Sequence, residues 1–109
     1  MSLFSQIAGW ADELSYDTSS FPLTYNLVGT LLFNPTMIIF DNQGTLPVNL
    51  SVNSTSTCKT FTAGEVFVLD MSANNAAAKD YFFNVGQAFY VGGSVGTGSF
   101  KISYLYRKA

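Results

Sequence analysis

The sequence predicts an all-β protein: an antiparallel β-sandwich, jelly-roll-like, with about seven or eight short strands and a short N-terminal helix or arm. Three observations support this fold class. Apolar and polar side chains alternate with period two after residue 20, turn residues recur at intervals of about 8–12 residues, and no long helical segment is present to connect parallel strands. The 109 residues suffice for one domain. We place this β-sandwich domain at residues 21–109, preceded by the arm at residues 1–20.

The first twenty residues contain the only helical pattern. Leu3, Ile7, Trp10 and Leu14 recur at spacings of four and three, as on one face of an amphipathic helix. The segment is therefore expected to be either a short helix or an arm. Its apolar stripe would pack on the protein's own sheet or on a neighbouring subunit.

Three strands are expected next. The extended run at residues 23–32 ends at Asn34-Pro35, because proline lacks a backbone donor and disfavours the helical conformation in the residue before it. The apolar run 36–41 has the length of a buried strand. The segment 48–53 alternates between aliphatic and small polar side chains without exception, which is typical of a strand with one buried face.

The remaining strands are predicted at residues 57–62, 65–71, 81–85, 88–91 and 100–106. The strands 57–62 and 65–71 form a candidate pair, because Gly64 between them suits a hairpin turn. The glycine-rich stretch 92–99 is followed by a strand, whereas a phosphate-binding loop is followed by a helix. We therefore interpret it as a connection between two antiparallel strands.

The composition argues against an enzyme. The chain has no histidine and a single cysteine, so the commonest general base and a zinc ligand set are both missing. The acidic residues do not form a calcium-binding pattern. We expect no catalytic residue, no metal, no cofactor and no small-molecule substrate.

The charges also limit the partners. The five Lys and Arg residues are scattered, whereas nucleic-acid-binding proteins cluster them, so no nucleic acid is expected. The uncharged stretch 21–40 contains two prolines and two asparagines, which argues against a membrane-spanning helix. The N-terminus lacks the basic and apolar regions of a signal peptide.

The most informative feature is the shortage of charge. Only 11% of the residues are charged, whereas about 25% is usual. Between Thr18 and Cys58 the only acidic or basic side chain is Asp41, and residues 81–100 contain none. Neutral surfaces lose their water at little cost, so these strands are expected to form subunit contacts. The candidate contact residues are Phe4, Ile7, Trp10, Leu14, Tyr25, Tyr104 and Tyr106.

Several segments then point to a family. They are Ile39-Phe40-Asp41-Asn42-Gln43, the strand 48–53, Phe61-Thr62-Ala63-Gly64-Glu65, Val68-Leu69-Asp70, Ala88-Phe89-Tyr90-Val91 and Gly96-Thr97-Gly98-Ser99. From about Phe21 onward the chain resembles the small β-sandwich virion proteins of tailed double-stranded DNA bacteriophages. Their shared motifs are turn and strand residues, so no catalytic residue is implied.

The resemblance implies a structural virion protein that decorates or cements the phage capsid. Its expected partners are copies of itself, with a trimer as one such homo-oligomer, and the major capsid protein or other virion proteins. Its expected location is the virion, assembled in the host cytoplasm. The alternatives are a neck, tail or fibre-associated protein, or a sugar- or receptor-binding module in which Trp10, Tyr81, Tyr90 and Tyr104 would stack on sugar rings.

Overall fold

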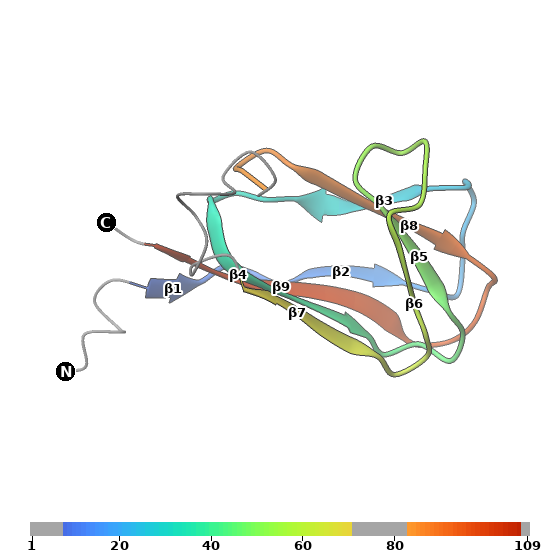
Figure 1. The fold of residues 1–109 in the computed structure, drawn as a ribbon. Helices are drawn as coiled ribbons and strands as arrows, with labels where there is room; N and C mark the ends of the chain where they lie inside the picture. Colours follow the sequence, from blue (N-terminus) through green and yellow to red (C-terminus); the bar gives the residue numbers. More distant parts are fainter. Residues whose placement is uncertain (1–7, 71–82, 108–109) are drawn as a thin grey trace.

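The computed structural model of the protein describes residues 8–70 and 83–107 and shows two antiparallel sheets packed face to face (Figure 1). Sheet A contains β1 (Ala8–Trp10), β2 (Leu14–Asp17), β4 (Pro35–Asn42), β7 (Val66–Asp70) and β9 (Ser99–Arg107). Sheet B contains β3 (Asn26–Thr30), β5 (Val48–Ser51), β6 (Lys59–Phe61) and β8 (Ala88–Gly93). The predicted all-β sandwich is therefore confirmed.

The strand pairing has jelly-roll order. β2 pairs with β9, β3 with β8, β4 with β7 and β5 with β6, all antiparallel. The chain therefore winds as one long folded ribbon whose successive pairs fall alternately in sheet A and sheet B. β1 pairs with β9 on the same side as β2, but nearer the C-terminal end of β9.

An aromatic and aliphatic core fills the space between the sheets. Alternate residues of each strand face inward, as period two requires. The ring of Phe40 in sheet A lies 5.6 Å from that of Phe61 and 5.7 Å from that of Phe89, both in sheet B. Phe61, Phe89, Phe100 and Ile102 are fully buried. Aromatic contacts between the layers therefore fix the spacing of the sandwich.

The helix alternative for the N-terminal segment is wrong over its described part. Residues 8–10 and 14–17 are the strands β1 and β2, and both pair with β9. Leu14 and Tyr16, two residues apart, pack against the core. The hydrogen bonds that the edge of β9 offers outweigh the local helical spacing of apolar residues. Residues 8–10 and 14–17 are thus edge strands of the sandwich.

Two predicted connections differ in the structure. β6 and β7 do not pair with each other, because the turn at Gly64 (φ 79°) carries the chain from sheet B to sheet A. The glycine-rich stretch 92–99 likewise joins β8 in sheet B to β9 in sheet A. Of the strand predicted at 81–85, residues 83–85 are not in a strand, and the rest lies outside the described residues.

Candidate interaction surface

β7 is an edge strand of sheet A with apolar side chains exposed to solvent. It pairs with β4 on one side and is the last strand in the sheet order. The exposed fractions are 57% for Val66, 36% for Phe67 and 50% for Val68. Edge strands are usually protected by charges, proline or a bulge. Within β7 the only charge is Asp70, at its end.

Among the described residues, one side of the β7 backbone has no neighbouring strand. The N–H of Asn42 donates to the carbonyl oxygen of Glu65 at 2.9 Å, so residue 65 points its carbonyl toward β4. In an antiparallel ladder this direction alternates along the strand, which turns the N–H and C=O groups of Val66 and Val68 away from β4. Within the described residues, no hydrogen bond from another element reaches these groups. They are available to another strand.

The outward side of sheet A continues this apolar surface. Residues directly opposite each other in a ladder share a face. Val68 lies opposite Ile39 in β4, and Leu105 of β9 lies opposite both Met37 and Trp10. Trp10 is 55% exposed. We define the outer patch as these residues together with Val66, namely Trp10, Met37, Ile39, Val66, Val68 and Leu105. Within it Met37 and Ile39 are half-buried, and Leu105 is buried beneath its neighbours at 8% exposed.

Lys101 and Asp41, two charged residues on the outward side of sheet A, contact polar partners within the chain. The ammonium of Lys101 lies 3.6 Å from the carboxylate of Glu13, and the hydroxyl of Ser103 also contacts that carboxylate at 3.3 Å. The side-chain amide of Gln43 donates to the carboxylate of Asp41 at 2.8 Å.

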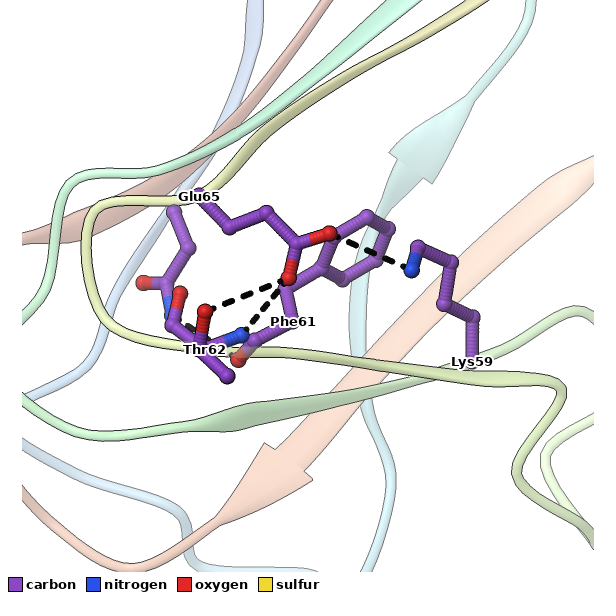
Figure 2. Close-up of polar contacts among 5 residues, drawn as sticks. Lys59, Phe61, Thr62 and Glu65 are labelled. Carbon is purple, nitrogen blue, oxygen red and sulfur yellow. Dashed lines mark hydrogen bonds and ion pairs between the residues drawn. The ribbon is translucent and has the colours of Figure 1, made fainter.

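An ion pair at the β6–β7 turn holds the start of β7 in place. Figure 2 shows the Glu65 carboxylate between the Lys59 ammonium, at 3.2 Å, and the backbone N–H of Thr62, which donates at 2.9 Å. The ammonium also lies 4.9 Å from the ring centroids of Phe61 and Phe67. The hydrogen bond from Thr62, and then Lys59, lower the pKa of Glu65.

The structure places some of the predicted contact residues at the surface. Trp10 is exposed and belongs to the outer patch. Leu14 is half-buried, and its side chain packs against the core instead of facing a neighbour. Phe4 and Ile7 lie outside the described residues. Their predicted role in contacts therefore stays a prediction.

The three predicted tyrosines are not brought together. Tyr104 is 1% exposed, and its hydroxyl accepts a hydrogen bond from the N–H of Leu32 at 2.8 Å. Its prediction as a surface contact residue is wrong, because alternation along β9 turns it into the core. Tyr106 is half-buried and stacks on Phe33 with a centroid distance of 3.9 Å. Tyr25 is half-buried and lies directly before β3 of sheet B.

Sequence reasoning missed Val66, Phe67 and Val68 as surface residues. A run of four apolar residues between two acids resembles a buried strand. What exposes the run is its place at the edge of sheet A, which depends on long-range pairing. The sequence signal that could have indicated this exposure is a strand with no polar residue on either face, flanked by charged residues on both sides.

The described residues offer little for metal or redox chemistry. They contain no group of three or more Cys, Asp or Glu residues placed to hold a metal ion. Cys58 is exposed, and partial desolvation raises the pKa of its thiol. In the described part of the chain, no helix is long and apolar enough to cross a membrane.

Comparisons with known proteins add no relative. No family model matches the chain, and neither the curated proteins nor the solved structures contain a match. The interpretation of the surface therefore depends on the residues of this chain.

Proposed function

We propose that the chain is a structural virion protein, a capsid decoration or cement protein that binds and stabilises a phage head. The single observation that carries the proposal is the outer patch, an apolar sheet face that continues into the unprotected edge of β7. The jelly-roll order of the strands and the resemblance from Phe21 onward support the same proposal.

Burying the exposed side chains of the outer patch against a partner would contribute favourable free energy. Burying a valine side chain completely contributes about 1.5–3 kcal/mol. Val66 and Val68 are about half exposed, so each would gain about 1 kcal/mol from a partner. Trp10 would add more, because its exposed area is larger.

The alternative of a sugar-binding module has less support. Sugar binding needs several aromatic rings on one surface. Trp10 belongs to sheet A, whereas Tyr90 belongs to β8 in sheet B, and its ladder position opposite Leu27 places it on the outward side of that sheet. Tyr104 is buried, and Tyr81 lies outside the described residues. Trp10, Tyr90 and Tyr104 therefore do not share one exposed face.

The copy number in purified particles tests the proposal. Quantitative gel densitometry against the major capsid protein is expected to give hundreds of copies per particle, since decoration follows the symmetry of the shell. About a dozen copies or fewer would support the neck, tail or fibre alternative instead. Absence from purified particles would contradict a virion role altogether.

A pair of variants tests the surface. Trp10→Ser removes the most prominent side chain of the outer patch and should reduce occupancy on particles that lack the native protein. Leu23→Ser is the matched control, because Leu23 is 66% exposed but is not part of the outer patch. Equal occupancy of the two folded variants would contradict the role of the outer patch.

A further inference from the structure

We infer that β7 pairs antiparallel with β7 of a second copy, so that sheet A continues across a two-fold axis into the partner's sheet A. This contact concerns the purified chain and requires no phage particle. Its failure would therefore leave the proposed attachment to a capsid standing, and the failure of that attachment would leave this contact standing.

The backbone limits the register of such a pair. Only residues whose N–H and C=O groups point away from β4 can bond to a new strand, and within the apolar run these are Val66 and Val68. Placing Val66 opposite Val68 of the second copy uses both residues in each chain. The arrangement forms four backbone hydrogen bonds and needs no contribution from Asp70.

The side chains match in this register on both faces. On the outward face, Val66 and Val68 would meet the same two valines of the second copy. In each copy, Val68 also lies opposite Ile39 of its own sheet. On the inward face, Phe67 would lie opposite its own equivalent at the axis. Phe67 is 36% exposed, so part of its ring is available for this contact.

A second copy fits this edge because the strand is self-complementary. In a two-fold contact the same surface meets itself, so each apolar residue must find an apolar equivalent. In this register Val66, Phe67 and Val68 satisfy this condition, because each lies opposite an apolar residue of the second copy. Glu65 would lie opposite Leu69 of the second copy, and its carboxylate is already paired with Lys59 of its own chain.

The first test is self-association of the full chain, measured by sedimentation velocity over a range of concentrations. Val68→Lys should weaken dimer formation by about tenfold or more, because a lysine on an edge strand opposes strand addition. The side chain of Val68 is half exposed, so the substitution should leave the fold intact, which circular dichroism checks. Val95→Lys is the matched control, because Val95 is 59% exposed on the β8–β9 connection.

The second test reads individual amides by hydrogen exchange in NMR spectra. In the dimer the amides of Val66 and Val68 should be protected, and this protection should disappear on dilution or in Val68→Lys. The amides of Phe67 and Leu69 point toward β4, so they should stay protected in monomer and dimer alike.

Three outcomes would overturn the inference. They are a chain that stays monomeric at every concentration measured, a dimer or trimer whose stability is the same in Val68→Lys as in Val95→Lys, and an oligomer in which the amides of Val66 and Val68 exchange as fast as in the monomer.

Discussion

Replacing Asn42 tests how the two sheets are joined at the β6–β7 turn. Asn42 ends β4 in sheet A and is fully buried. Its side-chain nitrogen donates to the carbonyl oxygens of Leu46 at 3.0 Å, Phe61 at 3.2 Å and Thr62 at 3.0 Å. Its side-chain oxygen accepts from the N–H of Gly44 at 3.0 Å. One amide therefore connects sheet A to the end of β6 and to the β4–β5 loop.

The magnitude follows from these contacts. The two N–H groups of the amide are shared among three acceptors, and each hydrogen bond is worth about 1 kcal/mol net. Asn42→Ala also leaves the N–H of Gly44 without its acceptor, at a cost of about 1–3 kcal/mol. The expected loss in the free energy of unfolding is about 3–5 kcal/mol. A domain of this size is stable by about 5–15 kcal/mol, so the loss is a large share.

The assay is urea unfolding at pH 7 followed by circular dichroism. Asn49→Ala is the control, because Asn49 makes a single exposed side-chain contact, in which its oxygen accepts from the Thr60 hydroxyl at 2.8 Å. The control should lose less than about 1 kcal/mol. A loss in Asn42→Ala no larger than that of the control would refute the role assigned to the buried amide.

Asn42→Asp adds a pH test at the same position. A carboxylate there would face three carbonyl oxygens, so folding would favour the protonated form and raise the pKa of the new carboxyl above about 3.9. A group with a raised pKa in the folded state loses its contribution to stability as pH rises through that value. The stability gap to the native chain should therefore widen from pH 3 to pH 7. A gap independent of pH would contradict the buried environment.

Two further predictions concern Glu65 and Gly92. The pKa of Glu65 lies below its usual 4.5 in the folded chain, so its stabilising effect is present above that value and is lost as pH falls through the folded-state pKa. Glu65→Gln should be less stable than the native chain at pH 7 in thermal unfolding, and the difference should shrink in acid; a constant difference would argue against the ion pair with Lys59. Gly92→Ala would place a Cβ on the carbonyl oxygen of Thr24 and should cost about 1–3 kcal/mol or more in urea unfolding. Native-like stability would contradict this close approach.

The strands were predictable where side chains alternate strictly and where an apolar run has the length of a buried strand. The segment 48–53 contains β5 (Val48–Ser51), and the run 36–41 lies within β4. The strand expected at 23–32 is shorter, because Asn26 bonds through its side chain to the N–H and C=O of Leu23 and makes a turn there. Such local competition by a side chain is hard to foresee from periodicity alone.

The predicted surface was only partly right, for a reason visible at two positions. Trp10 was expected at the surface because of its place in an apolar stripe, and it is exposed. Tyr104 is another of the predicted contact residues, but its register opposite Ile38 places it in the core. Residue type does not distinguish the two cases, whereas the ladder register does.

The order of residues along the chain was enough to establish the all-β class, the single sandwich and the absence of histidine chemistry. These properties follow from side-chain alternation, turn residues and composition, which are local. Only the tertiary structure decided that β7 is an edge strand, that Gly64 joins two sheets, and that residues 8–10 and 14–17 are strands. The physical reason is that edges and pairings depend on hydrogen bonds between residues far apart in the chain, such as Asp41 with Lys101 in the β4–β9 ladder. A local sequence pattern cannot specify which strand lies at the edge of a sheet.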